Sequence, residues 1–353
     1  EDNGEYETST TQEARSQEVE SSPVTTPSSA VRGLSISVDN KTGLLNISRM
    51  TPEVVGEIGD SDVWTIFVYM CGTDLETNCG MGTGDIAEMC AASDSDNVRF
   101  VVETGGTYEW QNSAVESESI QRFVVQHGAI EAVDEQLRTS MGSASTLSDF
   151  LLWGVENYAS EHMGVVLWDH GGGSVTGICF DERENYDSLS LAELDEALYT
   201  YYGQRGRRFD FIGFDACLMG TVETANILAT YADYMYGSEE TEPGSGWDYT
   251  AIGDFLASNP DADGLMLGKV VCDSFLAACK AQNDDNLTTL SVIDLGNIDT
   301  LLDAFNIFAS GMYNVSSNTA VRAEIIRAIE QADNFGGNNK SEGYTNMVDM
   351  GGI

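Results

Sequence analysis

Unbroken apolar runs alternate with amphipathic stretches along residues 63–333, and this alternation determines the expected fold. Residues 64–70 form a β-prone apolar run, as expected for a central strand that is covered on both faces. Residues 145–159 instead show a helical spacing, with Ser145 or Thr146 as the N-cap. Strands that alternate with helices predict an α/β fold, with a mostly parallel central sheet and helices on both faces.

The other segments follow the same alternation. Apolar runs predict further strands at residues 98–103, 164–170, 209–217, 234–238 and 289–293, and a hairpin at 119–133. Amphipathic patterns predict helices at residues 85–92, 248–258, 263–281, 297–311 and 318–333, with another that begins at Ser190. No internal repeat divides this region, which we expect to form a single domain.

The first 30 residues are rich in Glu, Ser, Thr and Pro, and cannot bury enough apolar area to offset their ordering entropy. Apolar and polar positions alternate within residues 34–47, which predicts a short hairpin or a pro-segment lying on the main domain. We therefore expect residues 1–60 to be an acidic, partly flexible leader and residues 61–353 to be the globular domain. The chain stops in an apolar stretch without a terminating signal, so we expect the natural protein to continue.

The charge balance is strongly acidic, with 58 acidic residues against 16 basic ones and a formal charge of -42. Nucleic acid and anionic membranes are excluded as partners, because phosphate binding requires Lys and Arg. A basic protein, a basic peptide or a divalent cation is attracted instead. No apolar run reaches about 18 residues, so we expect no membrane span. The acidic surface is typical of a secreted, soluble protein.

Seven cysteines, an odd number, do not form a disulfide framework in a chain of 353 residues. Cys90, Cys272 and Cys279 lie in apolar segments and are interpreted as core residues. Cys71 and Cys79 flank a short loop, where a disulfide is an open alternative. No CxxC pair is present, which argues against a structural zinc site.

A histidine and a cysteine each follow an apolar strand, His170 after residues 164–169 and Cys217 after residues 209–216. Chemistry gathers at the carboxyl ends of parallel strands. A base beside a thiol is the minimum for a cysteine nucleophile. Cys217 precedes a helix, whose N-terminus favours a thiolate. The N–H groups of Gly171 and Cys217 are candidate oxyanion donors.

Each residue alone has a structural explanation, Cys217 as a core thiol and His170 as a loop histidine. Their joint position at strand ends favours the catalytic interpretation. His127 lies in the expected hairpin, and His162 ends a helix, so both are weaker candidates for the base. Asp169 precedes the histidine, but successive side chains along a strand point to opposite faces, so we do not assign it as an orienting group.

The segments Asp169-His170-Gly-Gly-Gly and Asp215-Ala-Cys217-Leu-Met-Gly resemble the clostripain family of bacterial cysteine peptidases, within the caspase-like clan. Three further segments look like family elements: residues 64–70, 72–76 and 238–244. The similarity covers roughly residues 60–350. It implies a caspase-like fold, endopeptidase activity and cleavage after Arg or Lys. Some family members are processed between the His and Cys strands, and some need calcium.

The resemblance gives Asp215 a role, since a carboxylate two residues before the nucleophile can line the pocket for the residue preceding the scissile bond. It would pair with Arg in a bidentate manner or with Lys as a point charge. The alternative is an Asp that caps the turn before the helix. Glu240 and Asp248 are candidates for a second pocket acid.

The segment after the histidine contains a candidate processing site. Arg183 lies among acids in an exposed-looking loop between two core elements. We expect self-cleavage after this residue, which would convert a monomer into a two-chain form. Alternative sites are Arg205, Arg207 and Arg208 before the Cys strand, and Arg15, Arg32 and Arg49 in the leader.

No cofactor is required for this chemistry, and we assign no metal ligands. The sequence has no D-x-D-x-D-G loop. The pairs Asp94 with Asp96 and Asp261 with Asp263 are candidate calcium ligands, but acids in so acidic a chain are usually solvated. The resemblance nevertheless allows a calcium ion.

The sequence thus predicts a secreted or surface-exposed bacterial cysteine endopeptidase, made as a self-processing zymogen, that cleaves proteins or peptides after basic residues. The alternative is a non-catalytic, acidic surface or binding protein that retains the fold. An inactive descendant is expected to lose one of the two reactive residues, and both are present here.

Overall fold

The computed structural model describes residues 33–50, 59–92, 94–285, 288–339, 343–345 and 347–352. The chain divides into two compact units, residues 1–30 and residues 31–353, and all of the described structure belongs to the second. The flexible leader expected at residues 1–30 lies outside the described residues.

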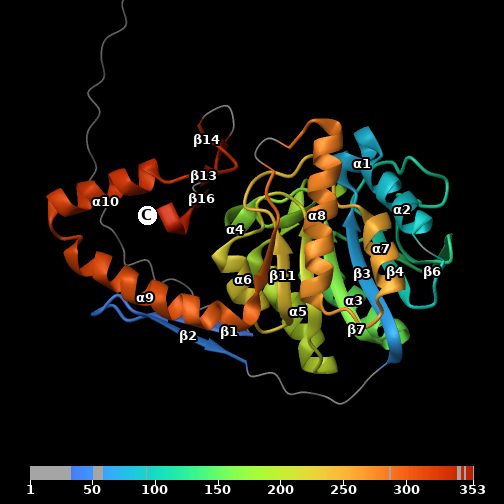
Figure 1. Cartoon of the computed structure of the whole chain (residues 1–353), viewed down its shortest axis with the longest axis horizontal. Helices are drawn as coiled ribbons and strands as arrows, with labels where there is room; N and C mark the ends of the chain where they lie inside the picture. The colour runs from blue at the N-terminus through green and yellow to red at the C-terminus, as the bar shows by residue number, and fades with distance from the viewer. Residues whose placement is uncertain are drawn as a thin grey trace, which may run out of the picture. The chain divides into compact units, whose positions relative to one another are not determined.

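Eight strands form the central sheet of this unit (Figure 1). They are β3 (Asp60–Cys71), β4 (Val98–Gly105), β5 (Ser119–Gln126), β6 (Ala129–Leu137), β7 (Ser160–Trp168), β10 (Phe209–Asp215), β11 (Ala232–Gly237) and β12 (Ser291–Asp294). Their spatial order is β12-β11-β10-β7-β3-β4-β5-β6. The five strands from β11 to β4 run parallel, whereas β12 and the β5–β6 hairpin add antiparallel edges. The predicted mostly parallel sheet is confirmed.

Helices cover both faces of the sheet (Figure 1). They are α1 (Thr73–Cys79), α2 (Met81–Ala91), α3 (Ala144–Tyr158), α5 (Leu191–Arg205), α6 (Val222–Leu228), α7 (Tyr249–Ser258) and α8 (Gly264–Gln282). Side chains of α3, α5 and α6 share one core cluster with Phe67. Side chains of α2, α7 and α8 share a second cluster with the next residue of the strand, Val68. This alternation follows from the two-residue period of a strand, and it confirms the expected α/β layers.

Two local expectations about α3 and α5 had different outcomes. Ser190 caps α5 as predicted, in a capping box with Glu193. The prediction that Ser145 or Thr146 caps α3 is wrong, because the helix begins at Ala144 and its N-cap is Ser143. Both predicted residues therefore already lie in the first helical turn.

The predicted loop between Cys71 and Cys79 is also a helix, α1, and both thiols are free. The disulfide alternative is therefore not realised. Helix α1 directly follows the central strand β3, so it holds the first residues after that strand in a fixed position.

The predicted N-terminal hairpin is present as β1 (Leu34–Val38) and β2 (Leu45–Arg49). It lies along α9 (Ile298–Val315), where the Asn306 side chain bonds both the N–H and the C=O of Leu45 at 2.8 Å. Leu34 is buried in the main core. The hairpin thus lies on the main domain, as the alternation of its residues indicates.

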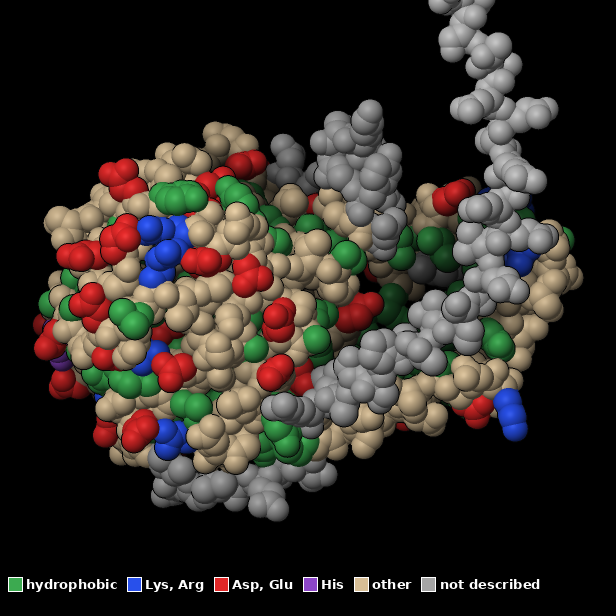
Figure 2. Space-filling model, turned by 180° about the vertical axis from the view of Figure 1, so that it is seen from behind, with side chains coloured by type: hydrophobic (Ala, Val, Ile, Leu, Met, Phe, Trp, Pro, Cys, Tyr) green, Lys and Arg blue, Asp and Glu red, His purple; other side chains and the backbone are tan. Residues whose placement is uncertain are grey.

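Short elements complete the described chain. They are α4 (Gly173–Thr176), β8 (Ile178–Asp181), η1 (Glu182–Glu184), β9 (Asp187–Leu189), η2 (Leu295–Asn297), α10 (Thr319–Gln331), β13 (Asn334–Phe335), β14 (Asn338–Asn339), β15 (Gly343–Tyr344), β16 (Met347–Val348) and η3 (Met350–Gly352). Among the described residues, no helix is both long and apolar enough to cross a membrane. Acidic side chains outnumber basic ones on the face seen in Figure 2.

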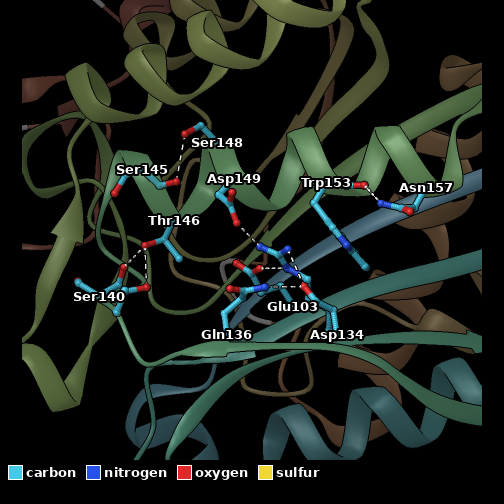
Figure 3. Close-up of polar contacts among 12 residues, drawn as sticks. Glu103, Asp134, Gln136, Ser140, Ser145, Thr146, Ser148, Asp149, Trp153 and Asn157 are labelled. Carbon is cyan, nitrogen blue, oxygen red and sulfur yellow. Dashed lines mark hydrogen bonds and ion pairs between the residues drawn. The ribbon is translucent and has the colours of Figure 1, made fainter.

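One buried cation is held by the outer strands of the sheet (Figure 3). The Arg122 guanidinium is 2% exposed and contacts Glu103 at 2.7 Å, Asp134 at 3.0 Å and Asp149 at 2.6 Å. It also stacks over Trp153, with 4.7 Å to the ring centroid. Three carboxylates and an aromatic face thus surround one guanidinium.

Candidate active site

The strands β3, β7 and β10 end at the same edge of the sheet. In the ladder, Trp168 pairs with both Met70 of β3 and Asp215 of β10. Because the three strands run parallel, the residues that follow them gather at this edge. His170 and Cys217 therefore leave neighbouring strands side by side, as the sequence predicts.

Gly171 brings the segment after His170 into contact with Cys217. A Cβ atom added to Gly171 would lie 1.9 Å from the carbonyl oxygen of Cys217 and 3.1 Å from its nitrogen. No side chain fits in this space, so glycine is required for the two backbones to meet. The close approach positions His170, the preceding residue, at the edge of the Cys217 loop.

The Cys217 sulfur lies among backbone N–H groups. The N–H of Glu242 donates to it at 3.3 Å. Burial raises the pKa of the thiol, while the N–H groups of Glu242, Cys217 and Gly171 oppose this shift. The N–H groups of Gly171 and Cys217 thus lie near the sulfur.

The expectation that a helix starts directly after Cys217 is wrong. Helix α6 starts at Val222, with Thr221 as its N-cap, and Leu218 adopts a left-handed conformation with φ of 66°. A loop therefore separates the thiol from the helix dipole. The loop of Glu242 supplies the N–H contact instead.

Asp74 of α1 is a site residue that sequence reasoning missed. Its Oδ1 lies 2.9 Å from Nε2 of His170, and the two side chains are 41% and 44% exposed. Asp74 follows the central strand β3 by three residues, within the family-like segment 72–76. The sequence could have indicated Asp74, because it follows β3, the neighbour of the strand that leads to His170. Parallel strands end at the same edge of a sheet.

Asp215 is buried on the α7 side of this edge. Its Oδ2 accepts hydrogen bonds from the Tyr249 hydroxyl at 2.9 Å and the Trp247 N–H at 3.4 Å. Burial raises its pKa to about 7, and these donors only partly offset the shift. Asp215 thus faces the loop and helix after the Cys strand, with no basic side chain among its described hydrogen-bond partners.

Two further acids border Asp215, and the sequence did not identify either. Asp85 of α2 is 7% exposed and accepts from the Trp168 indole at 2.6 Å. Both carboxylate oxygens of Glu242 are buried, with the Trp247 side chain as their one described polar neighbour. Burial and the Asp215 charge raise the pKa of both side chains. The backbone N–H of Glu242 also contacts the Cys217 sulfur, so the Glu242 loop connects the acids to this thiol.

The two acids expected near Asp215 lie in other surroundings. The Glu240 carboxylate accepts from the backbone N–H groups of Thr241 and Gly336. The Asp248 carboxylate caps α7 through the N–H of Ala251 at 2.8 Å. Both carboxylates therefore accept hydrogen bonds from backbone N–H groups. Neither belongs to the group formed by Asp85, Asp215 and Glu242.

The other two histidines have structural partners away from the thiol. His127 contacts both Asp94 and Asp96 in the turn of the hairpin. His162 pairs with Asp210 at 2.8 Å and stacks on Trp64 with 4.9 Å between ring centroids. These contacts agree with the choice of His170, and not His127 or His162, as the candidate base.

Asp169 likewise has a structural partner. Its side chain is buried and accepts from the N–H of Phe180. It therefore anchors β8 beside β7, which agrees with its exclusion as an orienting group.

Arg183 does not lie in an exposed loop, contrary to expectation. It belongs to the short helix η1, where its guanidinium bonds the Ser117 carbonyl and Glu118 and lies 5.6 Å from the Tyr108 ring centroid. Its side chain is 14% exposed. Cleavage after Arg183 would first require these contacts to break.

The alternative processing sites are also held by contacts. Arg205, Arg207 and Arg208 donate to main-chain or carboxylate oxygens. Arg49 bonds Asn226 and Asp299. Arg15 and Arg32 lie outside the described residues.

No group of three or more metal-binding side chains is present in the part of the chain that the structure describes. Asp94 and Asp96 flank His127, and Asp263 caps α8 through the N–H of Met266. The acids proposed from sequence as calcium ligands thus have protein partners, with the exception of the exposed Asp261.

Two surface cavities lie away from the thiol. One of about 690 Å³ lies between β2 and α9, and one of about 370 Å³ lies at the opposite edge of the sheet, beside Asp210 and Asp233. Neither lining includes His170 or Cys217. The candidate site at the carboxyl edge is therefore identified by its residues, His170 and Cys217, and not by a cavity.

Comparisons with known proteins agree with this architecture. The secreted C11 cysteine protease iotapain of Bacteroides thetaiotaomicron superposes with a TM-score of 0.55 at 17% identity, over 69% of each chain. An inactive zymogen C11 protease of Parabacteroides distasonis gives 0.52 at 21% identity, over 70% of this chain and 65% of the other. The fold is thus that of a C11 protease.

A sequence model of the clostripain family matches residues 68–352. The chain therefore belongs to the clostripain family of cysteine peptidases. Clostripain of Hathewaya histolytica is 24% identical over an alignment of 238 residues, and the match covers 57% of this chain and 44% of that protein. The chain thus spans less than half the length of that curated relative.

Proposed function

We propose that this protein is a cysteine endopeptidase in which Cys217 is the nucleophile and His170 the general base. The observation that carries the proposal is the contact between Gly171 and the Cys217 backbone, which joins the two reactive segments. A nucleophile and a base on adjacent strand ends are the arrangement that acyl transfer needs.

In the proposed reaction, His170 takes the thiol proton as the sulfur bonds to the substrate carbonyl carbon. The peptide C–N bond then breaks, and the amine leaves with the proton from His170. Water, deprotonated by the same histidine, attacks the acyl-enzyme and breaks the C–S bond. The acid product leaves and the thiol is restored.

The negative oxygen formed in each step would be stabilised by the N–H groups of Gly171 and Cys217, which lie near the sulfur. Asp74 would hold the His170 ring through Nε2, which leaves Nδ1 for proton transfer. A carboxylate in this place also stabilises the imidazolium that forms. Asp74 is thus a positioning residue that acts through His170.

We propose that the residue before the scissile bond is Arg or Lys. Asp215 is buried beside the loop that contacts the Cys217 sulfur, and no basic side chain of the described chain pairs with it. Buried carboxylates are normally paired with a cation. A basic substrate side chain would supply it. Glu240 and Asp248 are less suited to this role, because their carboxylates hold backbone N–H groups.

The biological setting follows from the relatives and the charge. We propose that the protein is a secreted bacterial enzyme, like the secreted protease of Bacteroides thetaiotaomicron, and that it acts on proteins or peptides with basic residues. Synthesis as a zymogen and cleavage after Arg183 remain part of the proposal, and so does the calcium ion that the family resemblance allows. Cleavage at Arg183 would require η1 to open.

The activity is tested with a fluorogenic peptide that ends in Arg, beside matched Lys and Asp peptides. We expect turnover of the basic peptides by the wild type, its loss in Cys217→Ala and His170→Ala, and its retention in Cys79→Ala. Cys79 is the exposed thiol of α1 and serves as a matched control. Equal turnover by Cys217→Ala, or none by the wild type after attempted processing, would favour the non-catalytic binding protein.

A further inference from the structure

We propose that Asp195 is a binding site for a chain N-terminus, the ammonium group that a cut after Arg32 creates at Gly33. Asp195 belongs to α5 and contacts the backbone of Gly33, 162 positions earlier in the chain. Its other partner, Tyr231, precedes β11, so the site lies at the opposite edge of the sheet from His170. The inference rests on the proposed function only for the origin of the cut, which falls after a basic residue.

The Asp195 carboxylate is buried with neutral partners only. Its exposure is 0%, its Oδ1 accepts from the Tyr231 hydroxyl at 2.6 Å, and its Oδ2 accepts from the Gly33 N–H at 3.4 Å. No ion pair within the described part of the chain includes it. Burial raises the pKa of Asp195, and the two donors only partly offset this shift. Because buried carboxylates are normally paired with a cation, this one lacks its usual partner.

The backbone of Gly33 is fixed against this carboxylate. Gly33 is buried, and its C=O accepts from the N–H of Met50 at 3.0 Å. A Cβ atom on Gly33 would lie 1.8 Å from the Tyr231 hydroxyl oxygen and 3.0 Å from Oδ1 of Asp195, so only glycine fits. The next residue, Leu34, is buried in the main core. All of these contacts are made by Gly33 and later residues, so a cut before Gly33 would leave them in place.

An ammonium at this nitrogen suits the carboxylate better than the present amide. The amide carries one donor and no charge, and 3.4 Å is long for a hydrogen bond to a carboxylate. Hydrolysis of the Arg32–Gly33 bond consumes one water and leaves a carboxylate on Arg32. The Gly33 nitrogen becomes an ammonium, because α-amino groups ionise near about pH 8. Asp195 thereby gains the cation that it lacks, and the new N-terminus is held in the domain.

The strand that begins with this segment can detach locally. In β1 only Leu34 is buried, residues 35–38 are exposed, and the strand pairs with β2 alone. Gly33 and Leu34 are thus the residues that must leave the core before a protease reaches the bond. Their return after the cut places the ammonium beside Asp195. The cut would therefore release the leader and fix the β1–β2 hairpin on the domain.

The test makes the cut without relying on this enzyme. In the Cys217→Ala variant of the full chain, a factor Xa sequence, Ile-Glu-Gly-Arg, is completed ahead of Gly33 by Ser29→Ile, Ala30→Glu and Val31→Gly. Cleavage should raise the Tm by at least about 2 °C, as one gained buried contact does in a large domain. The new amine should also resist an amine-reactive label, read by mass spectrometry of the N-terminal peptide. Adding Asp195→Asn should abolish the rise and the protection.

A cut one residue earlier is the matched control. The factor Xa sequence is moved back by one position with Ser28→Ile, Ser29→Glu, Ala30→Gly, Val31→Arg and Arg32→Gly. One extra residue then precedes Gly33, whose nitrogen stays an amide, so cleavage should leave the Tm unchanged and the amine reactive. No cut at Gly33, or the same rise in Tm at both cut positions or with Asp195→Asn, would overturn the proposal.

The wild type shows which protease makes the cut. After incubation, N-terminal sequencing and intact mass should find a chain that begins at Gly33 in the wild type and an uncut chain in Cys217→Ala. A wild-type chain cut stably at Arg15 or Arg49 instead would contradict the proposal. Stabilisation by the factor Xa cut without any self-cleavage would support the Asp195 site and count against the proposed peptidase function, so the two failures are distinguishable.

Discussion

Two groups of acids in this molecule, each built around a buried carboxylate, differ in one component, the cation. The acids around Arg122 surround a guanidinium that the chain supplies, with three carboxylates within 3.0 Å of it (Figure 3). The acids at the candidate active site, Asp85, Asp215 and Glu242, have no such partner among the described ion pairs. The first group lies within β4, β5, β6 and α3, and the second lies on the end of β10, on α2 and on the loop before α7.

This difference shows where the fold leaves buried carboxylates without a cation. Burying a carboxylate without a partner costs several kcal/mol, so structural acids are normally compensated. The Arg122 group follows this rule and links β4, β5, β6 and α3. The acids of the candidate active site have no cation, although Asp85 and Asp215 accept hydrogen bonds. Buried groups with shifted pKa values are candidates for function. The Arg122 group also shows how this protein holds a guanidinium, between several carboxylates and beside an indole ring.

The largest effect is expected from removing the internal cation. Arg122→Met should lower the free energy of unfolding by about 3–5 kcal/mol, because Glu103 is left buried and uncompensated. Chemical denaturation followed by circular dichroism measures the change. Adding Glu103→Gln to Arg122→Met removes the stranded charge and should restore part of the loss. Full stability of the single variant would contradict the assigned role.

Removing an acid from the candidate active site should lower activity without lowering the free energy of unfolding. Asp215→Asn should leave the protein as stable as the wild type or more so, since a buried charge disappears. It should lower kcat/KM for an Arg peptide by about 100-fold, the size of a lost hydrogen-bonded charge contact of roughly 3 kcal/mol. Steady-state kinetics and thermal denaturation on the same samples test both statements. A large loss of stability would place Asp215 with the structural acids.

The fold could be predicted from sequence because apolar periodicity reports burial directly. The runs at β3, β7 and β10 are continuous, as strands covered on both faces must be, and the amphipathic α3 and α5 follow from helical spacing. Local errors arose at element ends. The cap of α3 was misplaced, and α1 was not distinguished from a loop, because short polar segments carry little periodic signal.

The site was only partly accessible to sequence reasoning. His170 and Cys217 stand at strand ends, where topology alone brings them together. Asp85 and Glu242 lie on a helix and a loop that reach the pocket through tertiary packing, which spacing along the chain does not reveal. The error at Arg183 has the same origin, because its contacts with Ser117 and Glu118 join segments about 65 positions apart.

The pKa of Asp215 also predicts how activity depends on pH. Burial raises the pKa of Asp215 to about 7, so below that pH the empty pocket is protonated and must lose a proton to bind a cation. kcat/KM for an Arg peptide should therefore rise about tenfold per pH unit up to about pH 7, as expected for one ionisation. A citrulline peptide controls for the ionisation of the thiol and histidine, and an identical slope for it would contradict this origin.

The same shift predicts a falling stability over that range. An Asp ionises near pH 3.9 in the unfolded chain, so between about pH 4 and 7 the folded state holds more protons and stability decreases as pH rises. Thermal denaturation of wild type and Asp215→Asn should converge at pH 4 and separate toward pH 7, with the variant higher. Activity and stability would thus change in opposite directions through the same carboxylate.

The smallest effect is expected at Asp74, which is about 40% exposed and acts on His170 alone. Exposed ion pairs are worth about 0–1 kcal/mol, so Asp74→Asn should lower kcat by no more than about fivefold while KM stays unchanged. Steady-state kinetics across the pH range measure this loss as a lower profile of kcat against pH at an unchanged KM, the split expected of a group that acts on the base and not on the substrate. Asp94→Asn, at the acid beside His127, is the matched control and should leave the profile unchanged. An Asp74→Asn profile identical to the wild type would make the pair with His170 a surface contact, and the active site a dyad.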